Sequence, residues 1–371
     1  MKFKTACLAA SLAAAGMASA GIAQAQSSVT LYGIVDVSME TYNNAPKGDG
    51  GSGSVNGMRS GGLSGSRWGV KGVEDLGNGL KAVFTLESGF NVGNGRHSDS
   101  TRLFNRTAMA CLEHAKWGRL TFGRQYTSGF SMMGPFVPGA YGSQYEPTSR
   151  MLPSRADNAV VYSHRIAGVA VGGYYSFRDQ GDQVAFDAGT TNAWGGAVGY
   201  TFGDPKANSF RIMAAYDHLE DPANPAIALG DGQNAFIGAR WDTGKIRVLG
   251  GYRYRSLENI GTNGDDLNSD LYMLGLGYQI NVNTGVVLTY HREKFRRAPE
   301  GYLGTTDDTW QQLSFLASYG LSKRTNLYFV AAYAKDGAIN LGYAGDGGNA
   351  YVLADGESSQ TAAAVGFRHM F

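Results

Sequence analysis

The connections between the predicted strands constrain this chain more than any other feature, because short and long connections alternate along its whole length. The period-two pattern of apolar and polar residues that is typical of a β-strand recurs sixteen times after residue 27. Short turns and long polar loops follow these candidate strands in strict alternation. An up-and-down barrel with its turns at one end and its loops at the other requires this order, whereas a soluble sandwich or propeller does not.

The candidate strands begin near residues 28, 63, 79, 102, 117, 156, 168, 192, 208, 233, 245, 269, 284, 309, 325 and 359. Most are 10–14 residues long, which exceeds the usual length of about 5–6 residues and suits a tilted strand in a bilayer. The long polar loops are 43–62, 91–101, 128–154, 179–191, 221–232, 257–268, 298–308 and 336–358. We therefore expect an all-β chain that forms a transmembrane antiparallel up-and-down β-barrel of 16 strands, with residues 28–42 paired to 359–371 at its closure.

The first 25 residues have the pattern of an export signal. Two lysines precede an apolar stretch over 6–20, and Ala23-Gln24-Ala25 supplies the small-x-small cleavage pattern, so we expect one mature domain over 26–371. Cleavage would change the formal net charge from +1 to −1, because both lysines are lost. It would also leave Cys111 as a single cysteine, so an intramolecular disulfide is excluded.

Composition excludes several other classes of protein. The chain has 54 Gly, 21 Tyr, 17 Phe and 5 Trp with a net charge near zero, which argues against intrinsic disorder. Beyond the predicted signal, no apolar run reaches the roughly 20 residues of a membrane-spanning helix. Many aromatic residues fall near the predicted strand ends, where outer-membrane barrels carry aromatic girdles.

Charge is distributed unevenly between the loops and the strands. Five long loops follow residue 178. They hold sixteen acidic residues and no Lys or Arg when the second loop is counted from Glu220. The remainder of the mature chain therefore carries +15. Because a charge that faces lipid at mid-depth costs roughly 2–4 kcal/mol, we expect the strand cations to face a positive lumen. The acidic outer mouth is a candidate site for divalent cations shared with lipopolysaccharide phosphates.

The loop over 128–154 is too apolar for a solvated connection. It has 27 residues and includes the segment Met132-Met133-Gly134-Pro135-Phe136-Val137-Pro138-Gly139. Long loops of this kind are usually either functional or disordered. We expect it to pack against an inner wall, with disorder as the alternative.

The sequence predicts no catalytic, metal or cofactor site, and no nucleic-acid partner. None of the six histidines pairs with another at ligand spacing, and the Cys-x-x-Cys and Gly-x-Ser-x-Gly motifs are absent. An outer-membrane barrel enzyme remains one alternative, for which His164 is the strand histidine to consider. A barrel with a plugged lumen and a structural or adhesive role is the other.

Several motifs together resemble the Gram-negative general porins, and most closely their beta-proteobacterial branch. They are Ser28-Val29-Thr30-Leu31-Tyr32-Gly33, Ser66-Arg67-Trp68-Gly69-Val70-Lys71-Gly72, Glu74-Asp75-Leu76-Gly77-Asn78-Gly79-Leu80, Arg102-Leu103-Phe104-Asn105-Arg106, Phe122-Gly123-Arg124-Gln125-Tyr126 and Val365-Gly366-Phe367-Arg368-His369-Met370-Phe371. The resemblance implies a homotrimeric, water-filled passive diffusion channel for small hydrophilic solutes, surrounded by outer-membrane lipids. It also implies that the third loop folds inward and that Phe371 signals to the barrel-assembly machinery.

Three arginines match the arginine ladder that this family places opposite the third loop: Arg67, Arg106 and Arg155. Arg67 shares its strand parity with Lys71 and so points inward, while Arg155 directly follows the loop. Since the loop offers Glu146 as its one carboxylate and lacks the acid-rich pattern of cation-selective members, the resemblance implies an anion-selective channel.

Four further residues complete the predicted constriction. Lys71 and Asp36 lie on the inward parity of their strands, and Glu146 lies on the third loop. Arg124 shares its parity with outward-facing residues, so a bulge would be needed to turn it inward. The alternative for all of these residues is an ordinary role in the wall.

Overall fold

The computed structural model describes residues 27–48, 50–137, 144–147, 153–177, 192–204, 207–220, 231–260, 265–299, 308–342 and 351–371. The predicted export signal and most of the acidic outer loops lie outside these residues. The elements in chain order are β1 (Ser28–Pro46), β2 (Ser52–Ser60), β3 (Arg67–Gly77), β4 (Leu80–Gly89), β5 (Thr107–His114), β6 (Gly118–Tyr126), α2 (Ser128–Met133), η1 (Gly134–Phe136), β7 (Arg155–Ala156), β8 (Ala159–Ile166), β9 (Val169–Ser176), β10 (Ala193–Gly203), β11 (Ser209–Leu219), β12 (Gly232–Asp242), β13 (Ile246–Ile260), β14 (Asp265–Gln279), β15 (Thr284–Arg297), β16 (Thr309–Gly320), β17 (Thr325–Lys335), η4 (Ile339–Gly342) and β18 (Ser359–Met370).

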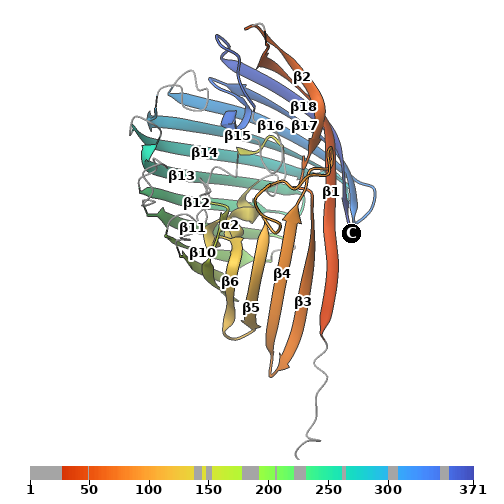
Figure 1. Cartoon of the computed structure of the whole chain (residues 1–371), viewed down its shortest axis with the longest axis vertical. Coiled ribbons are helices and arrows are strands. Elements are labelled where there is room, and N and C mark those ends of the chain that lie inside the picture. The colour runs from red at the N-terminus through yellow and green to blue at the C-terminus, as the bar shows by residue number, and fades with distance from the viewer. Residues whose placement is uncertain are drawn as a thin grey trace, which may run out of the picture.

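The strand segments form one closed antiparallel sheet in which neighbours along the chain pair with each other (Figure 1). β2 and β3 both pair with β1, and β7 and β8 both pair with β6, so each of these couples is one interrupted strand. The described residues therefore form a 16-stranded barrel, as predicted. Closure is also confirmed, because β1 pairs with β18 from Ile34↔Met370 to Tyr42↔Ala362.

Three predicted boundaries at the long-loop end are wrong. Residues 43–62 are largely strand, since β1 continues to Pro46 and β2 begins at Ser52. β14 begins at Asp265, within a predicted loop, whereas β5 begins five residues later than predicted, at Thr107. The ends of β1, β2 and β14 that extend beyond the bilayer have water on both faces, so they lose the apolar alternation that identifies a strand.

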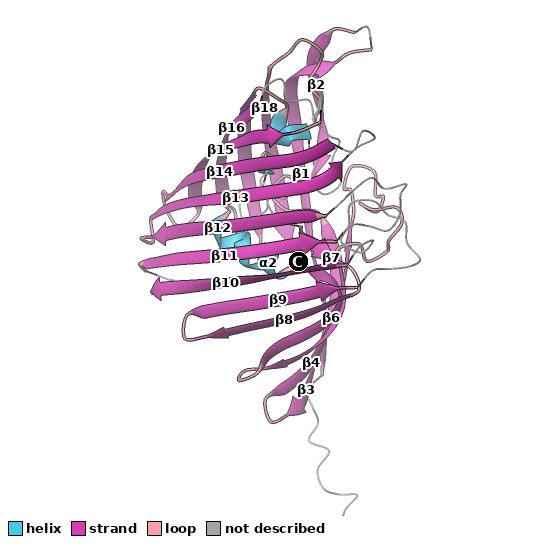
Figure 2. Cartoon of the chain, turned by 90° about the vertical axis from the view of Figure 1, so that its left-hand side faces the viewer, coloured by secondary structure: helices cyan, strands magenta, loops and turns pink. Residues whose placement is uncertain are grey.

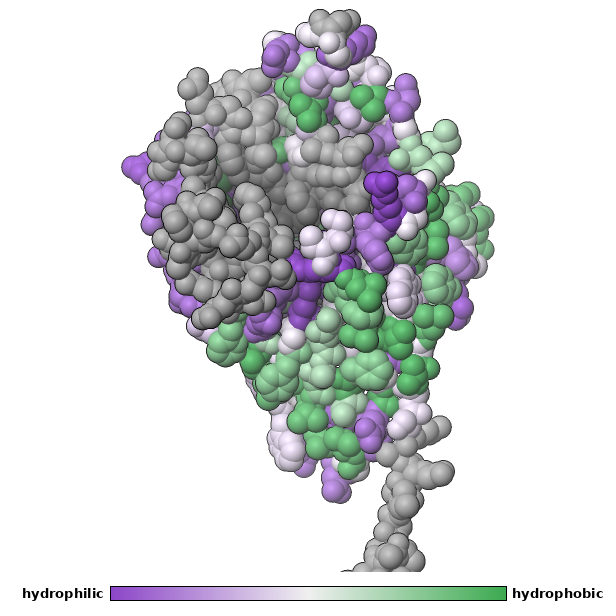
Figure 3. Space-filling model, in the orientation of Figure 1, coloured by the Kyte–Doolittle hydropathy of each residue, from purple (hydrophilic) through white to green (hydrophobic). Residues whose placement is uncertain are grey.

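The two faces of the wall differ as the alternation predicts. On β1, Leu31 and Met39 are 64% and 69% exposed on the outside, whereas Asp36 and Ser38 on the opposite face are buried. Apolar residues gather over the outer surface of β3–β6 (Figure 3). Cys111 is buried and free. Among the described residues, no helix is both long enough and apolar enough to cross a membrane.

The C-terminal residue lies against the first strand, beside β1 in Figure 1. The backbone N–H of Phe371 donates to the Gly33 carbonyl, and the Gly33 N–H donates to the Phe371 carbonyl, over 3.1 and 3.2 Å. A Cβ added at Gly33 would lie 2.3 Å from the Phe371 ring and 2.7 Å from the Arg67 carbonyl oxygen. Because neither contact is sterically possible, the closure requires glycine at this position.

We expect Gly33→Ala to weaken barrel closure, because the new methyl group must displace both the ring and the backbone of β3. Overpacking of this kind costs about 1–3 kcal/mol, so the temperature at which the barrel loses its compact electrophoretic mobility should fall. Gly57→Ala in β2 is the matched control, since a Cβ there meets nothing within 4 Å. Equal unfolding temperatures for the two variants would contradict this account of the closure.

Candidate functional site

The third loop enters the barrel through a short helix. Thr127 caps α2, since its hydroxyl accepts a hydrogen bond from the Phe130 N–H over 3.2 Å and donates to the Pro153 carbonyl over 2.7 Å. Phe130, Met133 and Phe136 are buried in one apolar cluster with inward side chains of β10–β14. Figures 1 and 2 place α2 inside the ring of strands, against β9–β11.

A second described part of the loop, residues 144–147, is held by hydrogen bonds. The Tyr145 carbonyl accepts from Ser314 Oγ and Gln312 Nε2 on β16, over 2.7 and 2.8 Å. The Tyr145 hydroxyl donates to Glu40 Oε1 on β1 over 3.0 Å. Burial, together with the nearby Tyr351 and Glu40, raises the pKa of the Tyr145 hydroxyl, so it stays protonated as the donor. The inward fold of the third loop is thus confirmed for 128–137 and 144–147.

The three ladder arginines lie on the wall strands around the point where the third loop begins. Arg67 is on β3, Arg106 immediately precedes β5, and Arg155 is on β7. These strands lie about halfway around the ring from β13–β16. The structure therefore brings the three residues together beside the start of the docked loop, since the Phe130 ring of α2 stacks on Tyr126 with 5.2 Å between the centroids. Residues 144–147 lie against β1 and β16.

Glu87 and Tyr126 hold the ladder arginines in place. Arg106 Nε donates to Glu87 Oε1 over 2.8 Å, and Arg67 Nη1 lies 3.7 Å from the same oxygen. Arg155 Nη2 donates to the Tyr126 hydroxyl over 2.9 Å, and its guanidinium carbon lies 4.4 Å from the centroid of that ring. Arg106 Nη2 reaches the same hydroxyl over 3.3 Å. Two of the three guanidinium groups contact the Glu87 carboxylate, and the three arginines with Glu87 have a formal charge of +2 together.

Lys71 and Glu146 lie in different surroundings. Lys71 is exposed on the inward face of β3, four residues after Arg67. Glu146 is buried, and its Oε1 lies 2.9 Å from Nε2 of the fully buried His291 on β15. Glu146 of the third loop therefore contacts the wall at β15.

Asp36 is on the inward face but is fully buried under the segment between β2 and β3. Its carboxylate accepts the backbone N–H groups of Gly62, Leu63 and Ser64 at 2.7–3.0 Å, and the Tyr328 hydroxyl at 2.6 Å. This carboxylate binds the interrupted strand to the wall. A role for Asp36 in the constriction stays a prediction that these contacts do not favour.

Arg124 is not brought into the ladder. A bulge is present where β6 passes from β8 to β7, next to Gly123 with its φ of +105°. Arg124 nevertheless keeps its pairing with Ala108, and its guanidinium binds Asp157 and the Asn105 carbonyl. Phe122 before the bulge is exposed on the outside and Tyr126 after it contacts the ladder, while Arg124 between them stays bound to Asp157.

Sequence reasoning missed Glu87, Tyr126 and His291. The inward parity of Glu87 on β4 was a usable signal, because a carboxylate on that face must meet a cation or water. Among the described residues, no three His, Cys, Asp or Glu side chains are arranged to hold a metal ion. His164 is half-buried beside a cavity at the short-turn end.

We expect Glu87→Gln to increase the preference for anions. The substitution removes one negative charge from between Arg67 and Arg106 while the side chain keeps its shape, so the ladder's net charge becomes +3 by the same count. The shift of reversal potential under a potassium chloride gradient measures the effect. A shift toward cations would contradict the placement of Glu87 at the lumen.

Comparison with known proteins bears on this arrangement. Residues 9–338 match the family model described as Gram-negative porin. The chain is 32% identical to an outer membrane porin protein of Bordetella pertussis, covering 94% of this chain and 96% of that protein. It is 29% identical to outer membrane porin protein 32 of Delftia acidovorans, with 94% and 95% covered. The solved anion-selective porin from Comamonas acidovorans superposes with a TM-score of 0.74 at 26% identity, covering 93% of this chain and all of that one.

Proposed function

Because this chain belongs to the Gram-negative porin family, we propose that it is an anion-selective channel in which Arg67, Arg106 and Arg155 set the selectivity. Membership places the chain in the outer membrane as a general diffusion channel. The observation that carries the proposal of anion selectivity is the net charge of +2 on the ladder, beside the point where the third loop enters the barrel. One structural relative is titled an anion-selective porin, which supports the same proposal.

Selectivity follows from a fixed charge inside a low-dielectric wall. The wall focuses the field of the arginines, so anions concentrate and cations are depleted where the lumen narrows. Arginine suits this role because it remains charged and offers carboxylate or phosphate two parallel N–H donors. The buried Glu87 and Tyr126 contacts fix the guanidinium groups, so little ordering is needed when an ion passes.

Conductance in a planar bilayer tests whether the barrel is an open channel. We expect purified protein to give stepwise current increases of nanosiemens order, carried mainly by chloride. A barrel plugged by its loops would give no steps, and that outcome would support the structural or adhesive alternative. The absence of catalytic activity stays a prediction, to be checked by assaying the same preparation for esterase activity.

We also propose that the protein assembles as a homotrimer. The exposed apolar residues Val29, Leu31 and Met39 on β1 and Met58 on β2 support a lipid or subunit contact there. Electrophoresis without heating should give a species of three times the chain mass. Family membership also supports the proposal that Phe371 is recognised by the barrel-assembly machinery. Deletion of Phe371 should then reduce the amount of folded protein in the outer membrane.

A further inference from the structure

A second group of arginines lines the inner wall below the third loop. Arg165, Arg211, Arg240 and Arg247 lie on β8, β11, β12 and β13, each within three residues of a short turn. They share strand parity with the buried inner residues Val161, Met213, Phe236 and Leu249, so all four face the lumen. We call them the vestibule arginines. Short turns of outer-membrane barrels face the periplasm, which places this group on the periplasmic side of the constriction.

The vestibule arginines carry more positive charge than their surroundings neutralise. Arg211 lies directly opposite Arg240 in the sheet, a like-charge pairing that destabilises neighbouring strands. The charged groups with the largest effect on Arg211 are Arg240, Asp242, Arg247 and Arg165. Asp242 is already bound by Arg240 over 2.6 and 2.8 Å and by Arg247 over 3.1 Å. Four guanidinium groups and one carboxylate leave +3 on this part of the wall, within the described residues.

Unused donors accompany this charge. Arg211 Nε is buried and has no hydrogen-bond partner within the described residues. Arg165 is exposed to the lumen. Buried donors of this type are normally satisfied by protein or by a bound group. The group therefore offers an incoming anion its positive charge together with the exposed N–H donors of Arg165.

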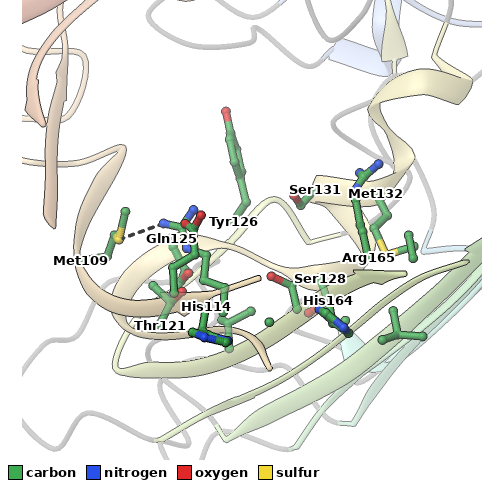
Figure 4. A pocket seen from close by; sticks show the side chains of 18 of the residues that line it. Met109, His114, Thr121, Gln125, Tyr126, Ser128, Ser131, Met132, His164 and Arg165 are labelled. Atoms are coloured by element: carbon green, nitrogen blue, oxygen red, sulfur yellow. Dashed lines mark hydrogen bonds between the residues drawn. The ribbon is translucent and has the colours of Figure 1, made fainter. Parts of the chain in front are cut away.

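The vestibule arginines also contact the third loop. Arg240 Nη1 donates to the Pro135 carbonyl of η1 over 2.6 Å, so the arginine lies directly against the docked loop. Arg165 also lines a cavity of about 690 Å³ together with Ser131 and Met132 of α2 and Arg119 of β6. Figure 4 shows Arg165 beside Met132. An anion that leaves the ladder toward the periplasm would meet these residues next.

We propose that the vestibule arginines form a second anion site, which binds a multivalent oxyanion such as a phosphate or a small dicarboxylate. This proposal rests on the proposed function, since it assigns the site a place in series with the ladder. A single chloride neutralises one charge, whereas a phosphate or dicarboxylate can bridge two guanidinium groups by paired hydrogen bonds. The site would thus slow multivalent anions while chloride passes.

Block of the chloride current tests this site. Inorganic phosphate and succinate are added in turn to each side of a bilayer that holds the full-length protein, and the concentration for half-block is measured. We expect block by either ion in the unmodified protein. In Arg165→Gln/Arg211→Gln the half-blocking concentration should rise about tenfold. Whichever ion blocks at the lower concentration identifies the favoured source of the oxyanion group.

Lys116→Gln, in the turn between β5 and β6, is the matched control, because it removes a positive charge at the same end but outside this group. It should leave the half-blocking concentration unchanged. Unchanged block in the double variant, or no block by either ion in the unmodified protein, would overturn the second site while chloride selectivity persists. A cation-selective unmodified channel would instead refute the proposed function. Unitary conductance in potassium chloride alone confirms that the double variant is folded.

Discussion

Replacing both Arg106 and Arg155 with alanine is expected to lower the ratio of chloride to potassium permeability by roughly 25-fold. A unit charge about 8 Å from a passing ion contributes about 2 kcal/mol at an effective dielectric constant of about 20, and salt of about 0.3 M reduces this to about 0.5 kcal/mol. The effect favours chloride and disfavours potassium, so the two ions differ by about 1 kcal/mol per arginine. Each arginine then accounts for about a fivefold preference. Reversal potentials measured under a potassium chloride gradient give the ratio directly.

Two controls separate charge from shape and position. Arg106→Lys/Arg155→Lys keeps both charges and should keep most of the anion preference. Arg324→Ala removes an exposed arginine from the turn between β16 and β17 and should change nothing. If the alanine double variant stays as anion-selective as the unmodified protein, then the ladder does not determine selectivity.

Removing the carboxylate of Glu40 is expected to release part of the third loop from the wall. Glu40 accepts hydrogen bonds from Gln144, Tyr145 and Tyr351, and its Oε2 pairs with Arg59 Nε over 2.8 Å. Arg59 and Glu40 are both buried, and loss of one partner from a buried pair costs about 3–5 kcal/mol. Glu40→Ala should therefore raise single-channel conductance and its noise, because Gln144 and Tyr145 lose their hydrogen bonds to Glu40 and keep on β1 the one that Ser38 donates to Gln144.

Glu40→Gln is the graded control for this effect. The amide retains the volume of the side chain and one acceptor oxygen, so the loop should be held more firmly than in Glu40→Ala. Protease cleavage within 128–154 gives an independent readout, with faster cleavage expected in the alanine variant. If conductance and cleavage match those of the unmodified protein, the attachment through Ser314, Gln312 and the apolar cluster suffices without Glu40.

Much of the fold could be predicted because lipid and water impose a strict alternation on every strand. Strand parity correctly places Arg67 and Lys71 on the inward face and Leu31 on the outward one. The same parity argued against Arg124, whose guanidinium binds Asp157, although Tyr126 of the same parity contacts the ladder. The alternation weakens where strands extend into water. For that reason residues 43–62, which hold the end of β1 and all of β2, were predicted as a loop.

The partners of inward residues could not be predicted, because they come from strands distant in the sequence. Parity puts Asp36 inside the barrel, but its burial depends on Tyr328 and on the segment between β2 and β3 folding over it. Glu87 likewise became part of the site only when three strands brought Arg67 and Arg106 to one carboxylate. The vestibule arginines were invisible for the same reason, since cross-strand register alone places Arg211 opposite Arg240.

The sign of the reversal potential of the unmodified protein tests the central claim most directly. A bilayer holding many channels separates concentrated from dilute potassium chloride, and the zero-current voltage is read. An anion-selective channel passes chloride into the dilute compartment, so that compartment should become negative. A positive dilute compartment would mean that cations pass more readily, and it would contradict the role assigned to Arg67, Arg106 and Arg155.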